Sequence, residues 1–117
     1  KAEIIGLETA FKKATGRDMA PFFRPPSGEF SSFSLMTTAN LGYYTVFWSF
    51  AYRDWEIDKQ KGGEYAFNQV TAHCHPGAVL LLHAVSRDNA EALRDIIRHL
   101  KAEGYVFLPL NRIIETL

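Results

Sequence analysis

The sequence predicts an α/β fold in which about four parallel strands alternate with helices. Two continuously apolar runs, residues 43–50 and 78–83, are rich in β-branched, aromatic or aliphatic side chains and are typical of strands covered on both faces. Segments with apolar residues at helical spacing separate such runs, and glycine repeatedly closes a helix before the next strand. Alternation of this kind indicates βα units around a parallel sheet, either a small open sheet or an arc of a barrel.

The first part of the chain fits this alternation. Residues 3–16 place apolar side chains at helical spacing, with lysines in the last turn and Gly16 as a C-terminal cap. The prolines of residues 21–28 forbid a helix there, so that stretch is predicted to be extended.

A second helix and the central strand come next. Ser31 or Ser32 can cap the helix, which stops at Gly42. Residues 43–50, with the sequence YYTVFWSF, are almost continuously apolar. We therefore expect this segment to be one central strand.

The alternation then repeats. A helix is predicted for residues 64–73, followed by a strand at residues 78–83. Asp88 and Glu91 are spaced as a capping box for a further helix that ends at Gly104. The next segment, YVFLP, is predicted as the last strand.

Composition limits the classes of partner. The 117 residues are enough for one domain, and 47% hydrophobic content is enough for a core. Thirteen basic and thirteen acidic residues balance, which argues against nucleic acid or an anionic membrane as the main partner. The apolar runs are too short for a membrane span. The chain opens at Lys1 inside a predicted helix, without methionine or signal peptide, so we expect a piece of a longer protein.

Polar residues follow three of the predicted strands. Arg24 ends the first extended stretch, Asp54 lies just past the central strand beside Trp55, and His83 ends the next strand. The carboxyl ends of parallel strands lie at one rim, where ligands bind in α/β sheets and barrels. These residues are therefore candidates for one site.

Each candidate also has a purely structural interpretation. Arg24 can cap carbonyl groups, Asp54 can serve as a turn residue, and Trp55 and His83 can belong to the core. A carboxylate near His83 would instead hold the ring and favour the imidazolium that acid catalysis requires. We therefore predict that Asp54 and His83 lie within hydrogen-bond reach or one water apart.

Other groupings of reactive residues are weaker. Residues 73–75, with the sequence HCH, lack a second ligand cluster that would complete a metal site, and nothing activates Cys74 as a nucleophile. His83, Ser86 and Asp88 contain the side chains of a serine triad, but no nucleophile elbow precedes them.

Three segments carry a resemblance that covers nearly the whole chain. FFRPPSGEFS, VFWSFAYRDW and VLLLHAVSRDNAEALRDIIRHLKAEGYVF resemble, in order and spacing, the last three motifs of the polysaccharide deacetylase or NodB-homology family. Within that family the chain is most similar to the spore-cortex peptidoglycan deacetylases that prepare muramic δ-lactam.

The resemblance implies roles for the candidate residues. Asp54 would tune His83, His83 would be the general acid that protonates the departing amine, and Arg24 would hold the catalytic base. Trp55 would form a wall of the sugar groove.

The resemblance also implies that Pro26 and Ser27 contact substrate. Ser27 stands where the family commonly has tyrosine or arginine, so its backbone N–H rather than a side chain is left to face the oxyanion.

Two family motifs, T-F-D-D-G and H-[ST]-x-x-H, do not occur in this sequence. They bring the base and the metal ligands, and they lie earlier in such proteins. The resemblance thus implies that residues 1–117 are the C-terminal half of a distorted (β/α) barrel. Its parent would use a divalent metal, zinc, to deacetylate N-acetylmuramic acid in peptidoglycan, outside the cytoplasm or in the spore envelope.

For this chain alone the same resemblance implies no bound metal and no activity. About four strands cannot close a barrel, so the sheet edge should be covered by the missing N-terminal half or by a second copy. Two other classes remain open. The chain could be a glycan-binding module with an aromatic groove of Trp48, Tyr52 and Trp55, or a structural α/β domain in which the rim residues are incidental.

Overall fold

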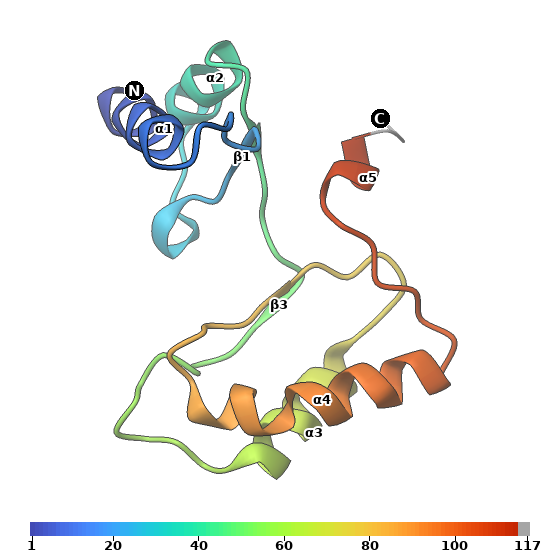
Figure 1. The fold of residues 1–117 in the computed structure, drawn as a ribbon. Helices are drawn as coiled ribbons and strands as arrows, with labels where there is room; N and C mark the ends of the chain where they lie inside the picture. Colours follow the sequence, from blue (N-terminus) through green and yellow to red (C-terminus); the bar gives the residue numbers. More distant parts are fainter. Residues whose placement is uncertain (115–117) are drawn as a thin grey trace. The chain divides into compact units, whose positions relative to one another are not determined.

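The computed structural model describes residues 1–114, which divide into two compact units, Lys1–Phe47 and residues 48–114. Within the described residues each unit contains one pair of parallel strands together with helices (Figure 1). Helices mixed with parallel strands confirm the predicted α/β class.

Helix α1 of the first unit spans Ala2–Thr15 and ends as predicted. Gly16 adopts φ 70°, and its N–H donates to the carbonyl of Lys12 at 2.8 Å. In this left-handed conformation the residue satisfies a carbonyl at the helix end, and glycine adopts it without strain because it has no Cβ. The apolar side of α1 is not buried, and Leu7 remains 61% exposed.

Helix α2 spans Ser32–Asn40, and Ser31 is its N-cap. The N–H of Ser34 donates to Ser31 Oγ at 3.1 Å, and the N–H of Ser31 donates to Ser34 Oγ at 2.8 Å. This reciprocal pair decides between the two serines that the sequence offered as caps. The helix is followed by a turn with Gly42 at φ 82°.

The predicted central strand, residues 43–50, is wrong as one element. Its start forms β2, Tyr44–Thr45, which pairs with β1, Phe22–Phe23, in the first unit. Its end leads into β3, Phe50–Ala51, in the second unit. The boundary between the units falls between these two strands, and each has one paired neighbour in the described chain. Apolar content alone did not reveal that interruption.

Strand β4, Leu80–Leu81, pairs in parallel with β3, with Phe50 opposite Leu80. Helix α3, Gly63–His73, lies between them in sequence, and helix α4, Arg87–Ala102, follows β4. The two helices lie side by side (Figure 1). A βαβ unit followed by a helix is therefore the frame of the second unit.

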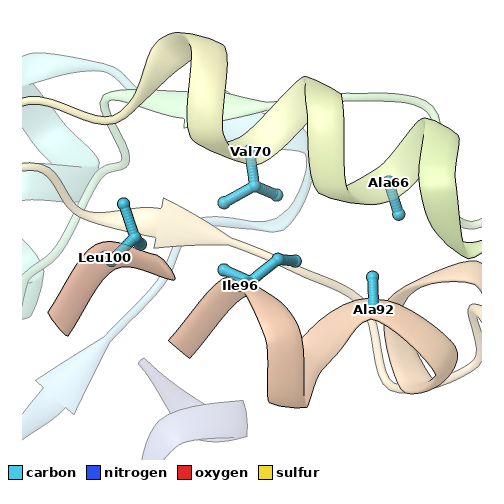
Figure 2. Close-up of a cluster of buried hydrophobic side chains, with 5 residues drawn as sticks. All are labelled: Ala66, Val70, Ala92, Ile96 and Leu100. Carbon is cyan, nitrogen blue, oxygen red and sulfur yellow. The ribbon is translucent and has the colours of Figure 1, made fainter. Parts of the chain in front are cut away.

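The core of the second unit lies between α3 and α4 (Figure 2). The face of each helix supplies residues at helical spacing, and side chains from β3 and β4 pack against the same cluster. Its buried members are Ala66, Val70, Ala92, Ile96 and Leu100.

The predicted capping box of Asp88 and Glu91 is wrong. Helix α4 is capped by Ser86, whose Oγ accepts from the N–H of Asn89 at 3.1 Å. Asp88 instead accepts from the N–H of Lys61 at 2.6 Å, so tertiary contacts take the side chain that local spacing assigned to the cap.

The predicted last strand, residues 105–109, is also wrong, since no ladder pairs it within the described chain. The N–H of Tyr105 closes α4 by donating to the carbonyl of Leu100 at 2.9 Å. A strand needs a neighbour for its backbone groups, and apolar composition cannot supply one. A short helix, α5, Asn111–Ile114, follows. None of the helices in the described part combines the length and apolarity needed to cross a membrane.

Replacing Ile96 by Ala should remove a central part of the core between α3 and α4. Ile96 is 2% exposed, so the change leaves a cavity and should lower the free energy of unfolding by about 2–5 kcal/mol. Urea denaturation followed by far-UV circular dichroism measures this. Leu93→Ala on the same helix, where the side chain is 47% exposed, is the control and should cost less than about 1 kcal/mol. If both variants lost the same free energy of unfolding, Ile96 would not be part of the core between α3 and α4.

Replacing Gly63 by Ala should destabilise the start of α3. A Cβ there would lie 2.9 Å from Glu91 Cβ on α4, and neither atom is at the end of a flexible chain. Gly6→Ala in α1 meets no atom within 4 Å and should stabilise its helix by roughly 0.5–1 kcal/mol. Thermal unfolding of the two variants should therefore shift in opposite directions. A stabilised Gly63→Ala variant would contradict the close packing of α3 on α4.

Candidate active site

Parallel pairing of β3 and β4 brings the key residues of the second unit together. Asp54 lies three positions after Ala51, the last residue of β3, and His83 lies two positions after Leu81, the last residue of β4. Because the strands are parallel and in register, both residues leave the sheet at the same end.

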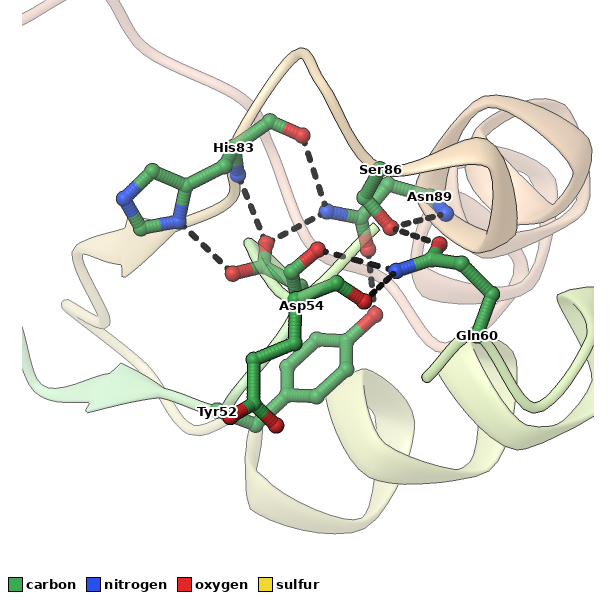
Figure 3. A network of polar contacts seen from close by, with 7 residues as sticks. Tyr52, Asp54, Gln60, His83, Ser86 and Asn89 are labelled. Atoms are coloured by element: carbon green, nitrogen blue, oxygen red, sulfur yellow. Dashed lines mark hydrogen bonds and ion pairs between the residues drawn. The ribbon is translucent and has the colours of Figure 1, made fainter. Parts of the chain in front are cut away.

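Asp54 and His83 contact each other directly. His83 Nδ1 lies 2.6 Å from Asp54 Oδ1, and the backbone N–H of His83 donates to Asp54 Oδ2 at 2.6 Å. The predicted contact is confirmed. A carboxylate only accepts, so the proton of this bond belongs to Nδ1. The second ring nitrogen points away from Asp54 (Figure 3).

Exposure differs sharply across this pair. The side chain of Asp54 has 0% exposure, whereas that of His83 is 29% exposed. One end of the ring is therefore fixed in the protein and the other is accessible. An imidazole held in this way can exchange a proton with a ligand through Nε2 alone.

Trp55 lies beside the imidazole. Its ring meets that of His83 edge-on, with the centroids 5.5 Å apart and the planes at 66°. The side chain is 49% exposed, so its assignment to the core is wrong. An exposed indole next to the accessible end of a histidine provides an apolar surface on which a sugar face can lie.

A buried polar network behind Asp54 was missed by sequence reasoning (Figure 3). Asn89 Nδ2 donates to Asp54 Oδ2 at 2.6 Å, and the Tyr52 hydroxyl donates to Asn89 Oδ1. Burial, assisted by the nearby Asp54 and Asp88 carboxylates, raises the pKa of Tyr52 to about 12. In the sequence, Asn89 looks like an ordinary residue of a first helical turn, and no local signal marks its tertiary role.

Gln60 joins the loop after Asp54 to the start of α4. Its Nε2 donates to the carbonyls of Asp54 and Glu56, at 3.2 and 3.0 Å, and its Oε1 accepts from Ser86 Oγ at 2.9 Å and from the N–H of Asp88 at 3.0 Å. Ser86 is thus a buried cap and loop anchor whose hydroxyl is directed to Gln60. A serine triad of His83, Ser86 and Asp88 is not formed.

The remaining candidates belong to the first unit. Arg24 follows β1 and is exposed, and Pro26 and Ser27 lie in a short 3-10 turn, Pro26–Gly28. Ser27 has φ 56° and is the one non-glycine residue with positive φ in residues 1–114. Such strain is concentrated at functional sites, which agrees with a binding role but does not assign one. The roles of Arg24, Pro26 and Ser27 stay predictions.

The described residues do not fit the divalent metal that the family resemblance implies. Residues 1–114 contain no group of three or more His, Cys, Asp or Glu side chains that could hold a metal ion. His73 Nδ1 contacts the carbonyl of Gln69 at 2.7 Å, and His75 Nδ1 contacts that of Pro76 at 3.0 Å. In the dyad, both oxygens of Asp54 already accept N–H groups.

Similarity to known proteins agrees with the motifs. The chain is 50% identical over 109 residues to the peptidoglycan-N-acetylmuramic acid deacetylase PdaA of Bacillus subtilis, matching 93% of this chain and 41% of that protein. It is 33% identical over 97 residues to a peptidoglycan-N-acetylglucosamine deacetylase of Bacillus cereus, matching 79% of this chain and 44% of that protein. No family model matches the chain.

Solved structures give the same result. Bacillus subtilis PdaA, a family 4 carbohydrate esterase, superposes with a TM-score of 0.93 at 45% identity over 99% of this chain and 50% of that one. A family 4 pseudoenzyme from Bacillus anthracis superposes with a TM-score of 0.74 at 28% identity, over 84% of this chain and 33% of that one.

These relatives define the class. The chain is homologous to the family 4 carbohydrate esterases, and the resemblance to polysaccharide deacetylases is confirmed. Among them it is similar to the PdaA deacetylase of Bacillus subtilis along almost all of its own length. It spans about half the length of the relatives it matches.

Replacing Tyr52 by Phe should change how stability depends on pH at the alkaline end. The folded state raises the pKa of Tyr52 from 10.0 to about 12, so folding holds the phenol proton more tightly. This contribution is complete below about pH 10 and is lost as the pH rises through about 12. The wild-type free energy of unfolding should thus fall between these values, and that of Tyr52→Phe should fall less.

Chemical denaturation at a series of pH values measures this difference. Tyr44→Phe removes an exposed phenol outside this network, so it should show the wild-type decline. Identical pH dependence in the wild type and in Tyr52→Phe would rule out a buried, proton-retaining hydroxyl at this position.

Proposed function

We propose that residues 1–117 form the C-terminal half of a peptidoglycan deacetylase domain. The reaction is hydrolysis of the N-acetyl amide of N-acetylmuramic acid, which frees the amine needed for δ-lactam synthesis. The observation that carries this proposal is the 2.6 Å contact between His83 Nδ1 and the buried Asp54 carboxylate. The names of both relatives support deacetylation of peptidoglycan, and that of the Bacillus subtilis relative supports N-acetylmuramic acid as the sugar.

His83 acts as the general acid. Hydrolysis breaks the bond between the carbonyl carbon and the sugar nitrogen, and that nitrogen must gain a proton to leave as an amine. A histidine that donates as an acid starts as the imidazolium, with a proton on each ring nitrogen. Asp54 holds Nδ1–H, so Nε2–H delivers its proton to the amine and the ring becomes neutral. Water adds its oxygen to the acetyl carbon, and the second product is acetate.

The other predicted residues act in binding. The half-exposed ring of Trp55 forms a wall against the sugar beside His83. Pro26 and the strained Ser27 contact the substrate in the turn that follows β1, with the Ser27 N–H available to the oxyanion. Arg24 orients the carboxylate that acts as base.

The whole enzyme is proposed to use a divalent metal, zinc, held by residues outside the described part of this chain. Peptidoglycan as substrate places the enzyme outside the cytoplasm, with the spore envelope as the specific site. The proposed partner of this chain is the remaining half of the domain or a second copy. Without that partner, the chain is expected to release no acetate.

A second candidate is a glycan-binding module without chemistry. Two observations favour it: the exposed indole of Trp55, and the similarity to a solved structure that is described as a pseudoenzyme of the family. Glycan binding by the wild-type protein without acetate release would support this alternative over catalysis. An incidental arrangement in a structural domain does not explain why a buried carboxylate is aimed at His83.

His83→Ala in the full-length protein that carries this chain should lower turnover on an N-acetylated peptidoglycan fragment roughly 10²-fold to 10⁴-fold. Asp54→Asn should lower it by a comparable factor, because the neutral amide keeps one acceptor oxygen for three N–H donors and loses the charge that stabilises the protonated ring. Acetate release measures turnover. His75→Ala removes an exposed histidine whose ring contacts only its own turn, and it should retain wild-type turnover. Wild-type activity in His83→Ala would disprove the assignment.

A further inference from the structure

Asn89 holds two parts of the dyad with one amide nitrogen. Its Nδ2 donates to Asp54 Oδ2 at 2.6 Å and to the backbone carbonyl of His83 at 3.2 Å. The residue is 7% exposed. An amide nitrogen carries two protons, and both are used here, one on the carboxylate and one on the strand end that bears the imidazole.

Asn89 is itself held at both ends. Its backbone N–H donates to the cap oxygen of Ser86, and its Oδ1 accepts from the Tyr52 hydroxyl. With the pKa of Tyr52 at about 12, that hydroxyl remains a donor at any physiological pH. A donor facing the amide oxygen fixes the amide orientation, because the reversed amide would point N–H at O–H and oxygen at carboxylate.

We propose that Asn89 is a positioning residue for the Asp54–His83 pair, and that Tyr52 sets its orientation. This proposal rests on the proposed function only for its kinetic consequence, since the contacts themselves are independent of the reaction. Asn89 joins the end of β3, the end of β4 and the first turn of α4. It therefore fixes the distance between the carboxylate and the imidazole from outside the pair.

The physical need for such a residue follows from the aspartate side chain. The terminal torsion of an aspartate is broad, so a carboxylate is not oriented by its own rotamer preference. Without Asn89, Oδ2 would keep one donor, the N–H of His83, and the carboxylate could rotate away from Nδ1. The amide is also neutral, so it orients the carboxylate without adding a charge that would compete with the imidazole.

The test compares Asn89→Ala with Asp88→Ala. Both remove a buried polar side chain in the first turn of α4 and should lower stability, but the carboxylate of Asp88 accepts from the N–H of Lys61 and, among its described contacts, has none with Asp54, His83 or Asn89. The first readout is the Nδ1–H proton of His83 in nuclear magnetic resonance spectra of this chain. A strongly hydrogen-bonded proton resonates at low field. That resonance should be lost or move upfield in Asn89→Ala and stay in place in Asp88→Ala.

The second readout is turnover of the full-length protein. Asn89→Ala should lower kcat about 10-fold to 100-fold with little change in KM, the effect of losing a hydrogen bond to a charged group. Tyr52→Phe should also move the Nδ1–H resonance upfield and lower kcat, but each by less than Asn89→Ala does. If Asn89→Ala does not fold, Tyr52→Phe carries the test.

The outcomes separate the two proposals. A full-length wild type that releases no acetate overturns the proposed function, while the resonance still tests the positioning role. An unchanged Nδ1–H resonance in a folded Asn89→Ala or Tyr52→Phe variant overturns the positioning role, whatever the enzyme does. Equal effects of Asp88→Ala and Asn89→Ala on kcat would also overturn it, because a general loss of stability would then explain both.

Discussion

The second unit depends on a carboxylate that is buried without a lysine or arginine partner among its described contacts. Asp54 is 1% exposed, and removing a carboxylate from water carries a penalty of several kcal/mol. Three N–H donors offset it: the ring and backbone of His83 and the amide of Asn89. These donors come from the end of β4 and from α4, so the carboxylate is satisfied only when both elements are in place.

That requirement extends to a loop with little regular structure. Two side chains hold the loop of residues 54–61. Gln60, near the end of the loop, donates to the carbonyl of Asp54 at its start, and Asp88 of α4 accepts from the N–H of Lys61. The first turn of a helix has N–H groups without partners, and here Gln60 satisfies that of Asp88. The loop that carries Trp55 is thereby attached to the start of a helix whose residues Ala92, Ile96 and Leu100 lie in the core. Binding residues on a loop thus gain the rigidity of the scaffold.

The difference between what the sequence predicted and what the structure shows has a physical pattern. Local signals predicted well: helix spacing and Gly16 gave α1, and Ser31 was among the expected caps. The Asp54–His83 contact was also predictable, because parallel strands bring their carboxyl ends together. The errors arose where the pairing of one strand with another determines whether a segment is a strand. Residues 43–50 divide between two strand pairs, and residues 105–109 have no ladder in the described chain.

The residues missed at the site have the same explanation. From the sequence, Tyr52 is expected only as part of an aromatic groove, and Gln60 and Asn89 have no expected role. Their polar contacts cross 26 to 37 positions of sequence, so neither spacing nor residue type marks these contacts. The error at Asp88 follows from this as well. An acidic residue near a helix start is a good cap locally, and only the position of Lys61 shows that the side chain is used elsewhere.

The distribution of burial bears on whether the site performs chemistry or only binds. A binding surface for a sugar face needs an exposed ring such as that of Trp55, and it gains nothing from a carboxylate with no exposure beneath the neighbouring imidazole. The buried carboxylate needs hydrogen-bond donors around it. Asn89 and Tyr52 supply a polar network in a part of the unit that apolar side chains could otherwise fill. An interior ion of this kind is often no more stable than a hydrophobic replacement, so stability alone does not account for it. Its effect is directional: with Nδ1 fixed inward, the imidazole offers a single nitrogen to whatever lies against Trp55. This is the property that proton delivery to a leaving amine requires, and it favours catalysis over binding as the proposed function of the site.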